Sequence, residues 1–367
     1  MEIFNWDLQE QILTNELLSM RNSLNPKNVK YDFDDITIVP EVLSTISSRK
    51  EVDPFIRING KKFLPLMTSP MDTVVDEHNF DRFKNNKVMI CLPRGVNIHS
   101  HYESVFPSIS LEDAEHLLEQ DIDENENDSY YCIDMANGHM KKLYDVVRLL
   151  DLKRPDVKLI VGNIANPKAF KLFGSLNNVW GIRVGIGGGG ACTTSANVAV
   201  HYPMASLIEE CYKIKCENFL KTKIIADGGM RKFSDIIKAL SLGADIVMVG
   251  SLFNKMLQSC SPTYFFKIFK VSGSIERWLF KRKYPLYKKF RGMSTKEVQK
   301  DWGKKKLTTS EGVVKWNEVL YDLPKWINNF EDYLRSAMSY TSSSNLTDFN
   351  NCQKIIISAN AYRRFSK

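Results

Sequence analysis

Short, almost wholly apolar runs recur along the chain, and each ends in small or polar residues before a stretch with helical periodicity. Apolar runs without polar alternation are typical of strands buried on both faces, as in a parallel sheet covered by helices. About seven or eight such units favour a (β/α)₈ barrel over a doubly wound sheet. The runs are FLPLMTSPMD (63–72), KVMICLPRG (87–95), YYCIDMANG (130–138), KLIVGNIA (158–165), VWGIRVGIGGGG (180–190), KIIADGG (223–229) and ADIVMVGS (244–251).

A single domain accounts for this pattern, because no linker, low-complexity tract or sequence repeat divides the chain. We expect an N-terminal helical extension at 1–30 and the barrel at 31–346, with a flap region at 252–320 inside it. A tail is expected at 347–367, and DENENDS (123–129) is interpreted as a loop insertion.

The beginning of the chain, MEIFNWDLQEQILTNELLSM, is acidic and helix-periodic, which argues against a secretory signal. No apolar run approaches the length needed to cross a bilayer, so no membrane partner is expected. The seven cysteines are odd in number and contain no CxxC spacing, so they indicate neither a disulfide framework nor a zinc ribbon. A reducing, intracellular compartment fits this usage, and we expect a cytoplasmic protein.

With 43% hydrophobic and 25% charged residues, the composition excludes a disordered chain. The net charge of +7 is compatible with a phosphorylated substrate or with nucleic acid. Much of it comes from residues 267–294, where lysines and arginines are interleaved with aromatic residues. We interpret this stretch as a solvated loop face rather than an RNA-binding one, so nucleic acid is not an expected partner.

Candidate chemistry lies where the apolar runs end, which is where a barrel places its active site. GIGGGGACTTS (185–195) leads a glycine-rich backbone to Cys192, and glycine permits positive φ and a close approach to a ligand. Alone, the stretch indicates either a flexible loop beside a structural cysteine or a presented nucleophile. Asp227-Gly228-Gly229 and Gly250-Ser251 end two successive runs, where barrels commonly bind phosphate. Asp227 could accept hydrogen bonds from ribose hydroxyls.

Taken in order, these motifs resemble the family that comprises IMP dehydrogenase and GMP reductase, over most of residues 31–346. YDFDDITIVP, SRKEVD and SPMDTV are similar to its opening segment, and GIGGGGACTT to its catalytic cysteine loop. IADGGMRKFSDIIKALSLGAD is similar to its phosphate and ribose segment, and FRGMS to its base and phosphate contact. The resemblance implies that Cys192 attacks purine C2 and that Thr194 and Glu311 handle protons.

The resemblance also implies binding residues. A monovalent cation such as potassium would lie at the backbone of Gly187, Gly189 and Cys192. Arg94, Asp134 and Asn137 would bind NADPH. The nucleotide would contact Met71, Asp227, Gly228, Gly229, Gly250, Ser251, Met293, Ser294 and Ser310. Family members are generally tetramers, so a homotetramer is implied as well.

Within the family, four segments point to the GMP reductase branch: CIDMANGHM, HYPMAS, FRGMS and TTSEG. The Arg-Tyr flap dipeptide of the dehydrogenase has no counterpart between Met293 and Glu311, and no regulatory domain interrupts the barrel. The resemblance therefore implies reductive deamination, in which GMP and NADPH give IMP, ammonia and NADP.

Alternatives stay open at this point. The same chemistry could act on dGMP or a modified purine, or the enzyme could oxidise IMP to XMP. Arg94 stands where the family usually has a lysine, and it keeps the charge but cannot serve as an acid at neutral pH. A catalytically inactive barrel used for binding is the alternative from another functional class.

Overall fold

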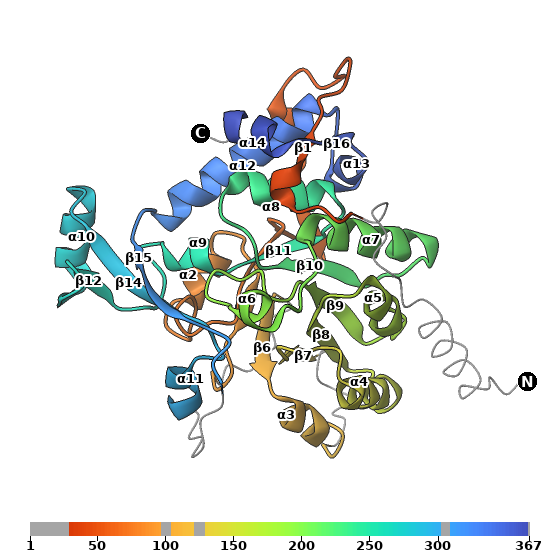
Figure 1. The fold of residues 1–367 in the computed structure, drawn as a ribbon, viewed down its shortest axis with the longest axis horizontal. Helices are drawn as coiled ribbons and strands as arrows, with labels where there is room; N and C mark the ends of the chain where they lie inside the picture. Colours follow the sequence, from red (N-terminus) through yellow and green to blue (C-terminus); the bar gives the residue numbers. More distant parts are fainter. Residues whose placement is uncertain (1–28, 97–103, 121–128, 302–308, 366–367) are drawn as a thin grey trace, which may run out of the picture.

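The structure is a computed structural model that describes residues 29–96, 104–120, 129–301 and 309–365. An eight-stranded parallel barrel lies at its centre, with strand order β4-β11-β10-β9-β8-β7-β6-β5 (Figure 1). A bridge between Met67 and Met89 joins β4 to the chain just before β5 and closes the cylinder. The predicted (β/α)₈ barrel is confirmed. Its strands are β4 (Leu66–Thr68), β5 (Ile90–Leu92), β6 (Val105–Ile109), β7 (Ser129–Asp134), β8 (Val157–Ile164), β9 (Val179–Val184), β10 (Lys223–Asp227) and β11 (Ile246–Val249).

Helices between the strands cover the outside of the barrel (Figure 1). Because successive strand residues face opposite sides, each strand sends one set of side chains inward and one set toward the helices. Met89 and Ile160 belong to an apolar cluster inside the barrel, whereas Ile90 and Leu159 pack in the layer between strands and helices. This double burial explains why the strands are apolar without alternation. The helices are α2 (Phe80–Lys84), α3 (Leu111–His116), α4 (Lys141–Lys153), α5 (Pro167–Gly174), α7 (Met204–Glu217), α8 (Phe233–Ser241), α9 (Ser251–Asn254) and α12 (Leu323–Tyr340).

The apolar pattern identified seven of the barrel strands and missed β6. This strand, VFPSI, contains Pro107 and Ser108, which shorten its apolar run. Proline normally argues against a central strand because it has no N–H to donate. Pro107 nevertheless lies opposite Leu92 of β5 in the ladder, and Ser108 pairs with Cys132 of β7.

The basic aromatic stretch, expected to be a loop insertion, is instead folded. It contributes β13 (Phe269–Val271), α10 (Gly273–Lys281) and β14 (Leu286–Arg291), and β12 (Thr263–Phe265) just before it and β15 (Val314–Glu318) after it complete a four-stranded antiparallel sheet. Leu279, Leu286 and Val319 form a small apolar core between α10 and the strands. We call β12–β15 with α10 the outer sheet, which extends away from the barrel (Figure 1).

The two ends of the described chain meet beside α8. β1 (Ile36–Ile38) pairs with β16 (Lys354–Ile356), and α13 (Leu346–Asn350) and α14 (Ala359–Phe365) also belong to the segment predicted as a tail. Lys354 Nζ donates to the carbonyl of Ser241, 2.7 Å away. Most of the expected N-terminal extension, residues 1–28, and most of the expected insertion at 123–129 lie outside the described residues.

Two further observations bear on the class of protein. Among the helices of the described residues, none is long and apolar enough to traverse a bilayer. All seven cysteines are described, and each one is free.

Candidate active site

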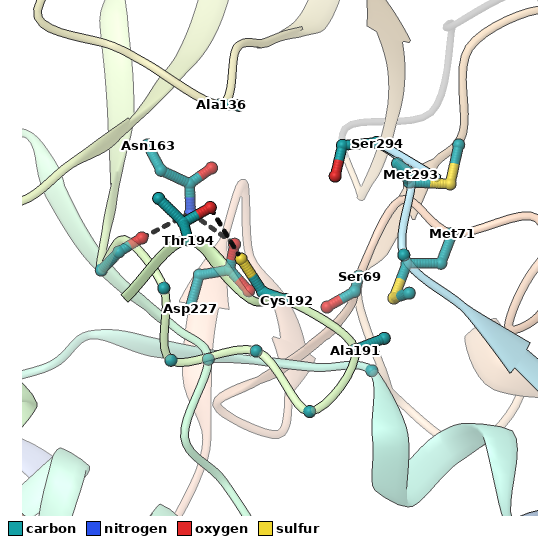
Figure 2. Close-up of a pocket in the computed structure, with 18 of the residues that line it drawn as sticks. Ser69, Met71, Ala136, Asn163, Ala191, Cys192, Thr194, Asp227, Met293 and Ser294 are labelled. Carbon is teal, nitrogen blue, oxygen red and sulfur yellow. Dashed lines mark hydrogen bonds between the residues drawn. The ribbon is translucent and has the colours of Figure 1, made fainter. Parts of the chain in front are cut away.

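A cavity of about 440 Å³ opens at the carboxyl ends of the barrel strands. The loops after β4, β9, β10 and β11 line it together with the segment that follows β14 and the one that precedes β15 (Figure 2). Segments far apart in the sequence meet here because parallel strands all end at the same rim. The scattered motifs of the sequence therefore converge on one place.

The glycine-rich loop before Cys192 lies directly on the Asp-Gly-Gly loop after β10. The amide of Gly229 donates to the carbonyl of Gly188, 2.8 Å away. Gly185 has φ +126°, and a Cβ there would lie 2.3 Å from the carbonyl oxygen of Asp227. No other residue can occupy this position without displacing the backbone. The glycines are thus required for close contact between the nucleophile loop and the loop that ends in Gly229.

Cys192 begins a chain of hydrogen bonds that ends at a carboxylate. Its Sγ donates to Thr194 Oγ1 at 3.2 Å, and the Thr194 hydroxyl donates to Glu311 Oε2 at 2.6 Å. Thr194 is the first residue of α6 (Thr194–Val198), whereas Glu311 comes from the flap before β15. This arrangement can carry a proton between the thiol and the carboxylate through one hydroxyl.

Backbone pairing fixes the flap against the nucleophile loop. The amide of Thr193 donates to the carbonyl of Glu311 at 2.8 Å, and the amide of Val313 donates to the carbonyl of Ala191 at 3.0 Å. Cys192 and Gly312 form an antiparallel bridge between these bonds. The carboxylate of Glu311 is therefore placed by a short ladder rather than by its side chain alone.

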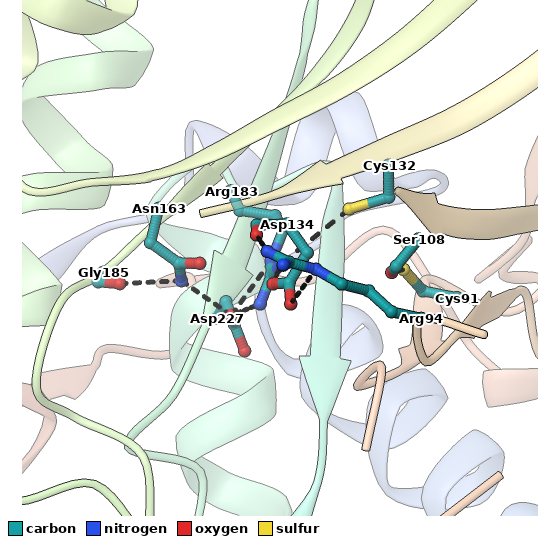
Figure 3. A network of polar contacts seen from close by, with 9 residues as sticks. All are labelled: Cys91, Arg94, Ser108, Cys132, Asp134, Asn163, Arg183, Gly185 and Asp227. Atoms are coloured by element: carbon teal, nitrogen blue, oxygen red, sulfur yellow. Dashed lines mark hydrogen bonds and ion pairs between the residues drawn. The ribbon is translucent and has the colours of Figure 1, made fainter. Parts of the chain in front are cut away.

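Asp227, at the end of β10, belongs to a buried polar network beneath the cavity (Figure 3). Its Oδ2 accepts from Asn163 Nδ2 at 2.7 Å and from Arg183 Nη2 at 2.8 Å. Among the described residues, no donor contacts Asp227 Oδ1. One carboxylate oxygen is thus held by the protein and the other is left for a ligand.

Arg183 joins two carboxylates. Besides Asp227, it contacts Asp134, whose Oδ1 accepts from Arg183 Nη1 at 2.5 Å. Only 6% of Arg183 is exposed. Burial opposes its charge, but Asp227 and Asp134 outweigh burial and hold the pKa of Arg183 well above its ordinary value. The guanidinium is therefore a fixed positive charge between β7 and β10.

Arg94 approaches the same carboxylate from the loop after β5. It donates to the main-chain carbonyl of Asp134, and its Nε lies 3.7 Å from Asp134 Oδ2. Arg94 and Asp134 both line the cavity, and so does Ala136. Asn137 is not among the lining residues, and its Oδ1 accepts from the amide of His139 at 3.1 Å.

The residues predicted to contact the nucleotide are also divided between those that line the cavity and one that does not. Ser310 does not line the cavity, because its hydroxyl turns to the carbonyl of Gly312 at 2.7 Å, and Thr309 lines it instead. Eight of the nine predicted substrate residues do line it: Met71, Asp227, Gly228, Gly229, Gly250, Ser251, Met293 and Ser294.

The predicted cation loop uses part of its backbone internally. The carbonyl of Gly187 accepts from Ser195 Oγ at 3.0 Å, and that of Gly189 accepts from the amide of Cys192 at 2.9 Å. Each carbonyl oxygen has a second lone pair, so both retain the capacity to contact a cation. In the described part of the chain, no cluster of three or more His, Cys, Asp or Glu residues could hold a metal ion.

Comparison with known proteins identifies the family. The model of the IMP dehydrogenase / GMP reductase domain matches residues 108–366, which is more than half of the chain. The chain belongs to this family. It is 27% identical to GMP reductase of Bacillus subtilis (strain 168) over 345 residues, covering 89% of this chain and 96% of that protein. It is 29% identical to GMP reductase 2 of Homo sapiens over 348 residues, covering 88% and 92% of the two chains.

Two members of this family site, Asn163 and Arg183, were not predicted from the sequence. Arg183 lies in VWGIRV, where a single charged residue interrupts an apolar strand. A buried charge requires a partner, so this interruption was a usable signal. Asn163 lies near the end of an apolar run, where a single uncharged polar residue gives no comparable signal.

Proposed function

We propose that this protein is an NADPH-dependent GMP reductase. The reaction consumes GMP, NADPH and two protons and yields IMP, ammonium and NADP⁺. The observation that carries the proposal is the chain from Cys192 through Thr194 to Glu311 at the wall of a nucleotide-sized cavity. The relatives named GMP reductase support the choice of substrate.

In the proposed mechanism, the Cys192 thiolate adds to C2 of the guanine ring. Loss of the exocyclic amine as ammonia leaves a thioimidate between Cys192 and the purine. Glu311 and Thr194 supply the proton that the leaving amine requires, because their hydrogen bonds end at Cys192 Sγ. The carbon–sulfur bond breaks after C2 has been reduced, and the thiolate is regenerated.

Asp227 favours a ribonucleotide. Its Oδ2 is held by Asn163 and Arg183, which leaves Oδ1 to accept from the ribose hydroxyls. Backbone amides of Gly228 and Ser251 would contact the 5′-phosphate at the rim where barrels commonly bind this group. A deoxyribose lacks one of the two hydroxyls that would donate to Asp227 Oδ1, so GMP is expected to be preferred to dGMP.

The cofactor would bind beside the nucleotide, where Arg94 and Asp134 line the cavity and would hold it. When bound, NADPH supplies a hydride to C2 of the purine. The residues fit this group: Arg94 brings a positive charge to an anionic ligand, and Asp134 is kept in place by Arg183. Ala136 lines the cavity together with Asp134.

We further propose that the loop of Gly187, Gly189 and Cys192 binds potassium and that the protein is a homotetramer acting in the cytoplasm. A potassium ion on these carbonyls would order the loop that presents the thiol. Initial rates in matched potassium and sodium buffers test the first point, with higher rates in potassium expected. Light scattering of the full chain tests the second.

A paired assay tests the proposed function. NADPH oxidation and ammonia release are measured with GMP, and NAD⁺ reduction is measured with IMP. We expect activity only in the first reaction, and Cys192→Ala should abolish it. Cys216→Ala is the matched control, because Cys216 is exposed on α7 away from the cavity.

Each other result has a distinct meaning. Activity only with IMP and NAD⁺ would identify a dehydrogenase. Equal activity with dGMP would refute the role of Asp227 Oδ1. Absence of GMP turnover by the folded wild-type protein would refute the proposed function.

A further inference from the structure

The outer sheet is strongly basic. Residues 263–289 contain eight lysines and arginines and one glutamate, which equals the net charge of +7 of the whole 367-residue chain. Seven of the eight cations are exposed, and only Lys288 is buried. The glutamate, Glu276, is occupied by a hydrogen bond from the hydroxyl of Thr263. This part of the molecule therefore presents a concentrated positive surface.

One face of the outer sheet is covered and the other carries aromatic rings. Leu286 of β14 packs with Leu279 of α10, so the helix covers the face on which Leu286 lies. Side chains alternate along a strand, so Tyr287 lies on the opposite face. The register places Tyr264 opposite Tyr287, and Lys289 opposite Trp316. Within the described residues, these three rings belong to none of the apolar clusters.

Lysines alternate with the rings on this uncovered face. Lys270 is the direct cross-strand neighbour of Tyr264. Lys267 Nζ lies 4.8 Å from the centroid of the Tyr287 ring, and Lys289 Nζ lies 5.8 Å from that of Trp316. Two of the rings thus lie against the ammonium groups of exposed lysines, and the Tyr264 and Trp316 rings contact each other edge to face, with centroids 5.2 Å apart.

From this arrangement we propose that the uncovered face of the outer sheet binds single-stranded nucleic acid. Bases stack on exposed aromatic rings, and interleaved lysines contact the phosphates between them. The ammonium groups of Lys267 and Lys289 can move from the rings to phosphate oxygens while bases take their places. A bilayer would be contacted by the exposed apolar side chains at the turn between β12 and β13, Phe266, Ile268 and Phe269, whereas the face of Tyr264, Tyr287 and Trp316 offers rings and cations at neighbouring positions.

The sequence alone did not favour this function. Read linearly, the basic stretch is typical of a solvated loop. Folding separates its residues into a covered apolar face and an uncovered face of rings and lysines, and the proposal depends on that separation.

The test uses the full chain without GMP or cofactor, so its outcome is independent of the proposed enzymatic activity. Fluorescence anisotropy is measured with labelled oligo-uridine and oligo-thymidine of about 12 nucleotides. At about 50 mM salt we expect binding in the micromolar range, weakening steeply toward about 200 mM. Each lost phosphate contact lowers the slope of log K against log salt by about 0.7 for a single strand.

Charge-matched variants locate the site. Lys267→Glu with Lys270→Glu should abolish most binding, and Lys267→Gln with Lys270→Gln should reduce the salt slope by about 1.4. Lys221→Glu with Lys325→Glu is the control, because both residues are exposed and lie outside the outer sheet. Tyr287→Ser should weaken binding about tenfold without changing the salt slope. Thermal unfolding curves verify that each variant is folded.

Three results would overturn the proposal. One is no anisotropy change at about 100 µM protein and low salt. Another is equal weakening by the control pair. The third is binding only to vesicles containing anionic phospholipid, which would assign the face to a membrane surface.

Discussion

Replacing Arg183 by methionine should both destabilise the fold and impair nucleotide binding. The guanidinium is 6% exposed and is the cation that Asp134 and Asp227 share. Removing one partner of a buried ion pair costs about 3–5 kcal/mol, because the remaining charge is left uncompensated. Two carboxylates lose their partner here, so we expect the upper part of that range. Such a loss is a large fraction of a stability of about 5–15 kcal/mol.

Urea unfolding and steady-state kinetics measure the two effects. Arg183→Met should also raise the KM for GMP, because Asp227 would no longer be held with Oδ1 toward the ribose. Adding Asp134→Asn removes one uncompensated charge and should recover part of the stability. Arg154→Met is the matched control: Arg154 is 7% exposed and pairs with Asp156 away from the cavity, so it should lower stability and leave KM unchanged. A loss below about 1 kcal/mol for Arg183→Met, with unchanged KM, would refute the reasoning.

Three further predictions concern other parts of the molecule. Gly185→Ala should abolish activity and lower the unfolding free energy by about 2 kcal/mol or more, because the added Cβ meets the carbonyl oxygen of Asp227. Gly60→Ala is the control, since nothing lies within 4 Å of its added Cβ, and it should cost only about 1 kcal/mol. Urea unfolding compares the two variants. Glu311→Gln should lower kcat about 10²-fold or more with little change in the KM for GMP, and an unchanged kcat would exclude the proton relay. Burial lowers the pKa of Lys288 to about 8, below that of the unfolded chain, so the unfolded state holds this proton more tightly at alkaline pH. The unfolding free energy of the wild type should therefore rise relative to Lys288→Met between about pH 8 and pH 10, by at most about 3 kcal/mol, and parallel pH profiles would contradict this.

The barrel was predictable from sequence because its strands are buried on both faces, and this leaves an apolar signal that survives without any alignment. β6 escaped because Pro107 breaks that signal, although the ladder accommodates it. The outer sheet escaped for another reason: along β14, the buried face carries Lys288 between Leu286 and Phe290, so no regular alternation of apolar and polar residues marks the strand.

The candidate site shows a similar division. Residues at strand ends, such as Cys192 and Asp227, were predictable because the barrel rim collects them. Arg183 was detectable as a charge within an apolar strand, but its partners were not predictable, since only the closed cylinder brings the two carboxylates together. Asn137 and Ser310 were carried over from resemblance, and their side chains instead form local hydrogen bonds outside the cavity lining.

The ladder between the flap and the nucleophile loop makes reactivity conditional on closure. Glu311 reaches Thr194 only while Gly312 and Val313 remain paired with the segment around Cys192. Any motion that lifts the flap to admit or release a nucleotide must break this pairing and withdraw the carboxylate at the same time. Under the proposed mechanism, a lifted flap would leave the thiol of Cys192 without the carboxylate of Glu311. Under the same mechanism, a substrate that holds the flap against the nucleophile loop would be favoured for reaction.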